Sequence, residues 1–402
     1  MKPLRTLFFC LISLGSLQGA DTQLLSPETQ ESLRQLRYQN DSEHEVLRYN
    51  WLSPLKLNGS YTQSKTAAAN GETALTQGYA SIAQDVFRSG GIDYQIAYAD
   101  ADYEGKNLSR YSTIGTLNSQ LFVALLNYRK YLRSLEQSDL KLKNEEIIIY
   151  IKRQLYEAGK ADITELNNAL MDKSTEQKNH ASLRYSIAEQ RYTIAKLSDV
   201  DPDTFELPAF ALIEQATYLN QNTDLQYART QNRVYGYQYD VTRSSFLPSV
   251  ALNANAGYAD ARVNGGIGDY TGNFYSAAAV LTIPFTYTAS DSVAQAKAAH
   301  LKQLADTALK ERETKAAYAQ ALELIRSYRE TIDISRQNLS LYDELIKVTK
   351  AGVDAGTKTG YDLQTIQNTK AIEELTIAIN EINIQIELAK LHFAADTTKE
   401  SL

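Results

Sequence analysis

Side chains that commonly perform chemistry are scarce in this sequence and are not grouped in known catalytic patterns. No histidine has a second histidine four residues away, which is the spacing that lets one helix face present two metal ligands. There is no Ser-His-Asp spacing, phosphate-binding loop or nucleotide fingerprint, and the Gly-Gly-Ile-Gly run at 265–268 lies between two predicted strands and predicts a turn. We therefore expect no enzyme, no metal site and no cofactor. The histidines are His44, His180, His300 and His392.

The first twenty residues have the pattern of a secretory signal. Two basic residues precede an apolar run at 7–17, and Gly19-Ala20 offers small residues for cleavage. Cys10, the single cysteine, lies inside this run, so we expect residues 1–20 to be removed and the mature chain to lack disulfides.

The composition argues against nucleic acid as a partner and against a membrane-spanning helix. The chain has 41 Lys and Arg against 48 Asp and Glu, a formal net charge of −7, which does not favour nucleic-acid binding. After residue 20, no apolar run approaches the roughly 20 residues that a membrane-spanning helix needs. A membrane role would therefore depend on strands.

A helical pattern occurs twice, at 135–166 and again at 332–363. In each copy four large apolar residues recur every seven positions, which predicts helices that wrap around a neighbour. The repeat of a whole pattern predicts a tandem duplication. The positions are Leu135, Leu142, Ile149 and Tyr156 in the first copy, and Ile332, Leu339, Ile346 and Val353 in the second.

An Ala-Gly pair ends each copy of this pattern. The pairs are Ala158-Gly159 and Ala355-Gly356, and glycine after a helical run is typical of a helix C-terminus followed by a reversal. We therefore predict two long antiparallel helical hairpins, one in each half of the chain.

Two predicted strands precede each hairpin, because the apolar period changes from helical to two. The strands are expected at about 50–63 and 75–87 in the first half, and at about 247–260 and 273–287 in the second. Strands of about ten residues with one apolar face and aromatic ends suit an outer-membrane barrel, but a soluble hairpin packed on helices fits the pattern nearly as well. Four strands cannot close a barrel, so the first reading needs several chains. The candidate lipid-facing residues are Tyr61, Leu252, Tyr258, Tyr275, Leu281 and Phe285.

The domain organisation follows from these elements. We expect a first repeat at 21–205 with its hairpin at 88–198, and a second repeat at 206–402 with its hairpin at 289–396. The fold class is mainly α with a small transmembrane β portion.

Helix lengths predict how the helices stack. The predicted helices 162–198 and 209–243 together nearly match the first long helix in length, and 359–395 with 26–49 approach the second. We expect each long helix to lie beside two short helices stacked end to end in these pairs.

The chain resembles the TolC family of outer-membrane efflux proteins. The run Ser-Ile-Ala-Gln-Asp-Val-Phe-Arg-Ser-Gly-Gly at 81–91 is similar to the strand, aromatic residue and glycine pair that lead into the family's long helix. Phe-Leu-Pro-Ser-Val at 246–250 resembles the second entry to the barrel. The two Ala-Gly turns, each followed seven residues later by Leu166 or Leu363, resemble the family's periplasmic helix turns. The resemblance spans nearly all of the chain.

This resemblance implies an assembly and a set of partners. Three chains would pool their strands in a twelve-stranded β-barrel and their helices in an α-helical barrel, crossing the outer membrane and extending into the periplasm. The duct would perform no chemistry. A periplasmic adaptor and an inner-membrane pump of the RND, ABC or MFS type would open it, and it would serve tripartite efflux or type I secretion.

The resemblance also implies a constriction at the helix turns. In the family, acidic side chains line the narrow end and polar links between helices hold it closed. Glu165 and Asp362, each six residues after a turn glycine, match the lining positions, and Thr164 and Lys358 match link positions. An acid in the first helical turn also stabilises the helix dipole, which is the alternative reading of both carboxylates.

Two departures from the family pattern affect this constriction. A tyrosine of the link is replaced by Val353, and a second acid is replaced by Thr365, so we expect a weaker or differently built link. Lys358 is equally consistent with a solvated side chain. Gly159 and Gly356 would mark the turns where the adaptor docks.

Two other classes of protein share some of these features with an outer-membrane channel. A periplasmic coiled-coil scaffold or adaptor would share the helical hairpins, but an adaptor should also carry a lipoyl-like β-domain and an inner-membrane anchor, and neither pattern is evident in the sequence. A general porin is nearly all strand, whereas this chain is mostly helical.

Overall fold

The computed structural model describes residues 22–66, 71–264 and 269–395. The predicted signal at 1–20, Asn70 and the predicted turn at 265–268 lie outside these residues. The helices are α1 (Pro27–Tyr49), α2 (Gly91–Glu157), α3 (Ile163–Leu197), α4 (Gln215–Gln221), α5 (Thr223–Ser244), α6 (Ala289–Asp354) and α7 (Gly360–Ala394). The strands are β1 (Lys56–Thr66), β2 (Gly71–Phe87), β3 (Ser249–Asn264) and β4 (Tyr270–Thr282).

The described residues form two compact units, and each unit draws on both halves of the sequence. Among the described residues, the helical unit comprises 22–34, Tyr111–Thr223 and 313–395. The sheet unit comprises Gln35–Arg110 and Asp224–Arg312. The compact units therefore do not follow the two predicted sequence repeats. Over the described ranges, no helix has a stretch long and apolar enough to cross a bilayer.

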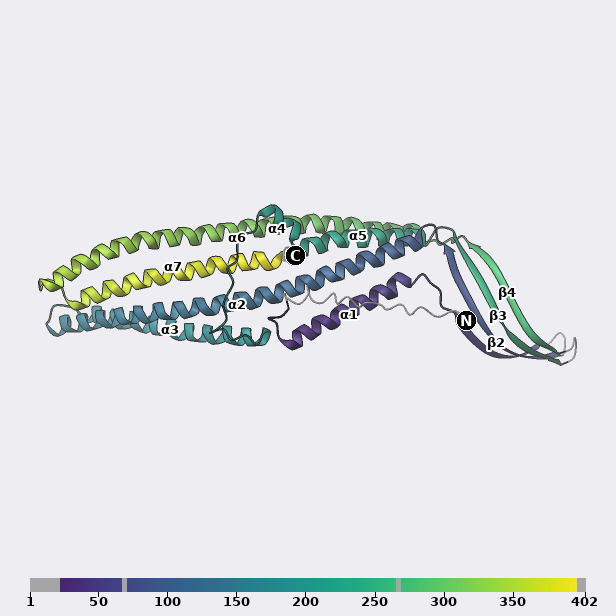
Figure 1. Ribbon diagram of the computed structural model, residues 1–402, viewed down its shortest axis with the longest axis horizontal. Helices are drawn as coiled ribbons and strands as arrows, with labels where there is room; N and C mark the ends of the chain where they lie inside the picture. Colours follow the sequence, from purple (N-terminus) through teal and green to yellow (C-terminus); the bar gives the residue numbers. More distant parts are fainter. Residues whose placement is uncertain (1–21, 67–70, 265–268, 396–402) are drawn as a thin grey trace, which may run out of the picture. The chain divides into compact units, whose positions relative to one another are not determined.

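The four strands form one antiparallel sheet in the order β1-β2-β3-β4 (Figure 1). Leu57 pairs with Ala80, Ala80 with Ala256, and Ala256 with Tyr275. Paired residues share a face and consecutive residues alternate between faces, so the register assigns every strand residue to one of two faces. We call the face that carries Leu57 and Tyr275 the apolar face and the opposite one the polar face.

All four strands differ from the predicted bounds by a few residues, and the start of β1 and the end of β4 differ most. β1 begins at Lys56 rather than near residue 50. The backbones of Trp51 and Ser53 bond to the side-chain amide of Gln84 instead of joining the backbone ladder of the sheet. β4 ends at Thr282, so the predicted stretch to residue 287 is corrected. Pro284 has no N–H to donate to the ladder, which explains the early end.

Four helices lie side by side within the helical unit. α3 lies against α2, as in the contact of Lys173 with Glu146 at 2.9 Å. α2 lies against α7, where Asn368 bonds to Asn144 at 2.8 Å. α7 lies against α6, which Figure 1 shows side by side. The lateral order is therefore α3, α2, α7, α6.

The short helices stack in pairs other than those predicted. The backbone N–H of Ser26 before α1 donates to the carbonyl of Leu197 at the end of α3, at 2.8 Å. Asn222 before α5 forms a β-bridge with Ala395 after α7. The start of α1 therefore meets the end of α3, and the start of α5 meets the end of α7. Helix lengths alone could not decide this, because the pairing depends on which helix ends meet.

The predicted single helix at 209–243 is also corrected. Residues 209–214 are not helical, and the helical residues that follow are divided between α4 and α5 at Asn222. Asn222 is buried and makes the bridge to Ala395, which a continuous helix would prevent.

An aromatic cluster joins α2 to the last turn of α7. The rings of Phe122 and Phe393 stack with centroids 5.0 Å apart, and Phe210 packs edge-on against Phe122. Gly115 on α2 lies so close to α7 that a β-carbon there would collide with the carbonyl oxygen of Phe393 and lie 3.5 Å from its carbonyl carbon. The backbones of the two helices are therefore in direct contact at this point.

Candidate functional site

The turns at Gly159 and Gly356 have the same backbone structure. Both glycines have left-handed φ values, +68° and +73°. In each turn the glycine N–H donates to the carbonyl three residues earlier, at 2.9 and 3.0 Å, and the next N–H donates to the carbonyl five residues earlier, at 2.8 Å. This pair of bonds is the Schellman motif, which satisfies the last carbonyls of a helix. A β-carbon at either glycine would meet nothing within 4 Å, so the backbone conformation, not crowding, favours glycine.

The start of α3 uses acidic side chains in two different ways. Asp162 is the N-cap and accepts a hydrogen bond from the backbone N–H of Thr164 at 3.2 Å. Glu165 forms an ion pair with Lys152 on α2, across the hairpin. Both partners are partly exposed, with 49% and 34% of their side-chain surfaces accessible.

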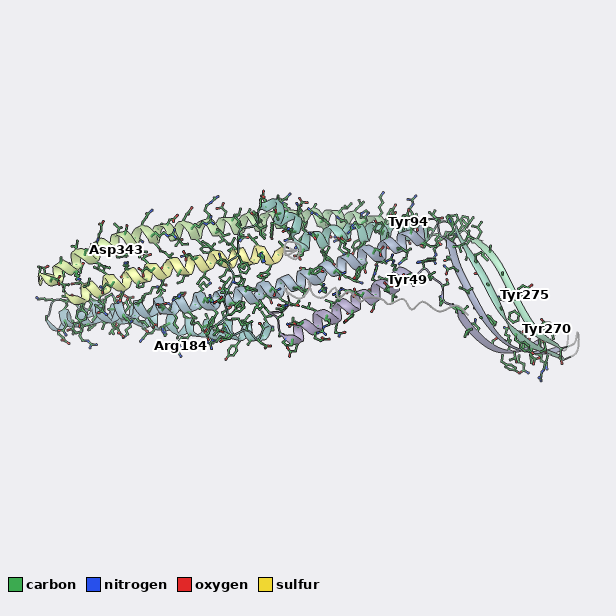
Figure 2. The ribbon with its side chains drawn as sticks, viewed as in Figure 1. Tyr49, Tyr94, Arg184, Tyr270, Tyr275 and Asp343 are labelled. Atoms are coloured by element: carbon green, nitrogen blue, oxygen red, sulfur yellow. The ribbon has the colours of Figure 1, made fainter. Side chains whose placement is uncertain are left out.

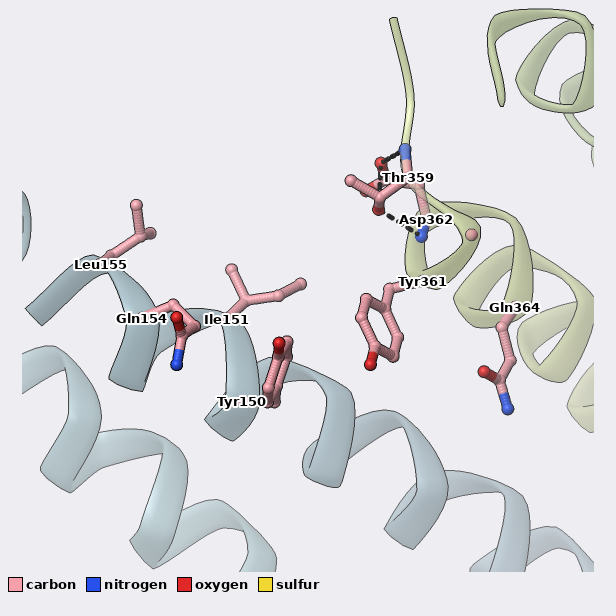
Figure 3. Close-up of a pocket in the computed structure, with 9 residues that line it drawn as sticks. Tyr150, Ile151, Gln154, Leu155, Thr359, Tyr361, Asp362 and Gln364 are labelled. Carbon is pink, nitrogen blue, oxygen red and sulfur yellow. Dashed lines mark hydrogen bonds between the residues drawn. The ribbon is translucent and has the colours of Figure 1, made fainter. Parts of the chain in front are cut away.

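The start of α7 uses its matching acid as part of the cap. The Thr359 hydroxyl accepts the backbone N–H of Asp362 at 3.2 Å, and the Asp362 carboxylate accepts the backbone N–H of Thr359 at 2.8 Å (Figure 3). This reciprocal capping box lowers the pKa of Asp362, chiefly through the bond from the Thr359 backbone and then through its hydroxyl. The charge of Lys358 lowers this pKa further.

The predicted tip residues are only partly brought together within one chain. Lys358 lies close enough to Asp362 to affect its pKa, and the backbone N–H of Lys358 donates to the carbonyl of Gly352 at 3.1 Å. Across the described residues, no hydrogen bond or ion pair links Thr164 or Glu165 to Lys358 or Asp362. The carboxylate of Asp362 caps the start of its own helix, α7, which agrees with the interpretation of this acid as a helix-stabilising residue.

A contact that the sequence did not predict joins the two hairpins. The rings of Tyr150 on α2 and Tyr361 on α7 lie 5.1 Å apart at 47°, beside a groove of about 750 Å³ (Figure 3). Thr359 and Asp362 line the same groove. A signal for this contact exists in the duplication, because Tyr361 and Thr164 occupy equivalent positions five residues after their glycines but differ in type.

The register places five of the six predicted lipid-facing residues on the apolar face. Tyr275 is 89% exposed and projects from β4, and Tyr270 lies at the start of the same strand (Figure 2). Phe285 lies beyond the end of β4 and is 92% exposed, so the register assigns it to neither face and its lipid-facing role stays a prediction. The five that share the face are Tyr61, Leu252, Tyr258, Tyr275 and Leu281.

His44, His180 and His392 have structural partners, and the ring of His392 lies 5.3 Å from that of Phe210. His44 lies 2.8 Å from Asp100 and stacks on Tyr103, and His180 lies 3.0 Å from Asp139. Over the described ranges, no three His, Cys, Asp or Glu side chains form a group that could hold a metal ion.

Solved structures resemble this one over almost the entire chain. The outer membrane protein VceC of Vibrio cholerae matches with a TM-score of 0.72 at 15% identity, covering 93% of this chain and 94% of VceC. The CmeC outer membrane channel of Campylobacter jejuni matches at 0.69 and 14%, covering 95% and 87%. The MtrE outer membrane channel of Neisseria gonorrhoeae, solved in an open state, matches at 0.62 and 16%, covering 90% and 85%. The fold is therefore that of outer-membrane channels.

The second half of the sequence matches a known family model. Residues 212–395 match the model described as Outer membrane efflux protein. The predicted resemblance and fold class are confirmed by this match and by the agreement in fold. The predicted location in the outer membrane agrees with the family description and with these three structures. A comparison with curated protein sequences gives no match.

Proposed function

We propose that three copies of this chain form a passive exit channel in the outer membrane, which extends into the periplasm and serves a tripartite efflux or type I secretion system. The strands would form a twelve-stranded barrel, and the helices would form the periplasmic duct. A periplasmic adaptor docking near Gly159 and Gly356 and an inner-membrane pump would open it. The efflux family match and the fold of the channels above support this proposal.

One observation carries the proposal: the sheet has a continuous exposed apolar face and two strand edges, those of β1 and β4, without a neighbour among the described strands. An exposed apolar face of this kind is unfavourable in water and favourable in lipid. Open edges are unfavourable in lipid, where no water can bond their N–H and C=O groups, and in water they favour pairing with other strands. Pairing β4 of one chain with β1 of the next, within a membrane, would place the apolar face in lipid and leave neither edge unpaired.

A charge-insertion experiment tests the lipid-facing assignment. Changing Leu252, Ala254 and Ala256 together to lysine places three charges on the apolar face of β3. Each lysine near the bilayer midplane should cost about 2–4 kcal/mol, so assembly in the outer membrane should fail. Changing Asn253 and Asn255 to lysine is the matched control, because the polar face should tolerate charge. Unchanged membrane assembly of the triple variant, measured by membrane fractionation, would show that the assignment is wrong.

We further propose that Glu165 and Asp362 of three chains line the narrow end of the duct, with Lys358 and Thr164 beside them. Such a ring of carboxylates would favour cations. The double change Glu165→Gln and Asp362→Asn should reduce cation selectivity, measured as the reversal potential across a planar bilayer under a salt gradient. Asp162→Asn is the control, because asparagine keeps the cap while removing one nearby charge. Equal reversal potentials in all three proteins would leave Asp362 with its role in the helix cap and Glu165 with its ion pair to Lys152.

A further inference from the structure

The polar face of the sheet carries one row of aromatic side chains among polar ones. In this row Asn58 pairs with Tyr79, Tyr79 with Gly257, and Gly257 with Phe274. The two rings are therefore on β2 and β4, with a glycine between them on β3. Both rings are half-buried within the chain, so each retains an accessible surface.

The glycine lets the two rings approach each other across β3. Their centroids are 6.1 Å apart and their planes are tilted by 56°, within the range of favourable aromatic pairs. A β-carbon at Gly257 would lie 2.7 Å from the α-carbon of Tyr79, so no other side chain fits at this position. Tyr79 and Phe274 therefore form a continuous aromatic ledge on a face that is otherwise rich in Asn and Ser.

A polar hollow lies beside this ledge. The next row on the same face is Lys56, Ser81, Asn255 and Ser276, about 7 Å away by strand geometry. Three of these residues, with Asn253, line a hollow of about 260 Å³. The row offers one cation and several hydrogen-bond donors.

We infer that Tyr79, Phe274 and Lys56 form a binding site for solutes that combine an aromatic ring with an anionic group, such as aromatic carboxylates and sulfonates. The ring of the solute packs on the ledge, and the anion meets the Lys56 ammonium and the amide and hydroxyl donors beside it. The inference rests on the proposed function, because the polar face lines a lumen only if the apolar face meets lipid. Three chains would place six aromatic rings at one level of that lumen.

Two matched probes separate the aromatic term from the charge. Benzenesulfonate and cyclohexanesulfonate have the same anionic group and nearly the same size, but only the first has an aromatic ring. Added to the strand-turn side of a planar bilayer, both should block the potassium current. Benzenesulfonate should do so at about two- to tenfold lower concentration, the range expected from aromatic pairing.

Variants test the residues. Tyr79→Leu with Phe274→Leu should remove the preference for benzenesulfonate while keeping apolar bulk, and Tyr79→Phe should retain it. Lys56→Gln should weaken block by both probes to a similar degree. Lys65→Gln is the matched control, because Lys65 is on β1 but belongs to the apolar face by register. If the double leucine variant fails to assemble, the two single leucine changes should each reduce the preference.

The outcomes distinguish this inference from the proposal beneath it. A conducting wild-type protein that responds equally to both probes, or a preference that survives the leucine changes, overturns the aromatic site and leaves the channel intact. Absence of any conductance from the purified trimer overturns both.

Discussion

The two hairpin turns have the same backbone but use their matching acids differently. At the first turn Glu165 reaches across the hairpin to Lys152, while the cap is made by Asp162. At the second turn Asp362 is itself half of the cap with Thr359. Duplication has preserved the chain reversal at both turns, whereas the side-chain contacts around it differ.

This difference shows which part of a turn depends on local sequence. The glycine conformation is set by the backbone alone, so it is the same in both copies. The acid six residues later has a choice of partners, and neighbouring residues decide between them. Lys152 is available to Glu165, whereas the equivalent position on α6 is Thr349. Equivalent positions in a duplicated chain therefore need not have equivalent roles.

The largest effect should come from the residues that the turns share. Gly356→Ala or Gly159→Ala forces a side chain into the left-handed region and should lower the free energy of unfolding by about 1–2 kcal/mol. Gly360→Ala, only four residues away at the start of α7 and without a positive φ, should be neutral or stabilising by up to about 1 kcal/mol. Urea unfolding in detergent measures both, and equal effects at 356 and 360 would contradict the conformational argument.

The caps should have the next largest effect. Thr359→Ala removes the hydroxyl that accepts the Asp362 N–H and should cost about 1 kcal/mol, as should Asp162→Ala at the other turn. Thr164→Ala is the control, because only its backbone N–H takes part in the cap. Hydrogen exchange of the first amides of α3 and α7 would localise the loss, and exchange that is equally fast in the Thr164 variant would rule out capping as its cause.

The cap at the second turn should make stability depend on pH through Asp362. The pKa of Asp362 is lower in the folded chain than its ordinary value of 3.8, so its contribution to stability is complete above that value and is lost as the pH falls through the folded pKa. The difference in melting temperature between the wild type and Asp362→Asn should therefore be constant above roughly pH 5 and shrink at lower pH. A difference that stays constant down to pH 2 would contradict the lowered pKa.

The smallest effect should come from the ion pair at the first turn. Lys152→Ala removes the partner of Glu165, but both side chains are partly exposed, and such pairs contribute only about 0–1 kcal/mol. Raising the salt concentration should reduce even this difference. A loss larger than that of Thr359→Ala in the same urea assay would reverse the ranking of the two turns.

Local patterns in the sequence were enough to predict the hairpins and the strand faces. The seven-residue repeats and Ala-Gly pairs act over one or two helical turns, and Gly159 and Gly356 have the conformation that a reversal requires. Alternation along β3 likewise predicts that Leu252 and Tyr258 share a face, because consecutive strand residues must alternate.

Contacts between distant segments could not be predicted in the same way. The meeting of the start of α1 with the end of α3 depends on bonds from Ser26 to the Leu197 carbonyl and from the Ser198 hydroxyl to the Leu24 carbonyl, and no periodicity encodes it. The contact of Tyr150 with Tyr361 depends on how α2 and α7 pack. Comparing the halves would have marked both tyrosines, because Lys347 and Thr164 occupy the equivalent positions in the other copy.

The contact at Gly115 sets a dimension of the helical unit. At Gly115 the backbone of α2 meets the carbonyl of Phe393 directly. The separation of the axes at this level is therefore fixed by the radii of main-chain atoms, and mutation can increase it but cannot make it smaller.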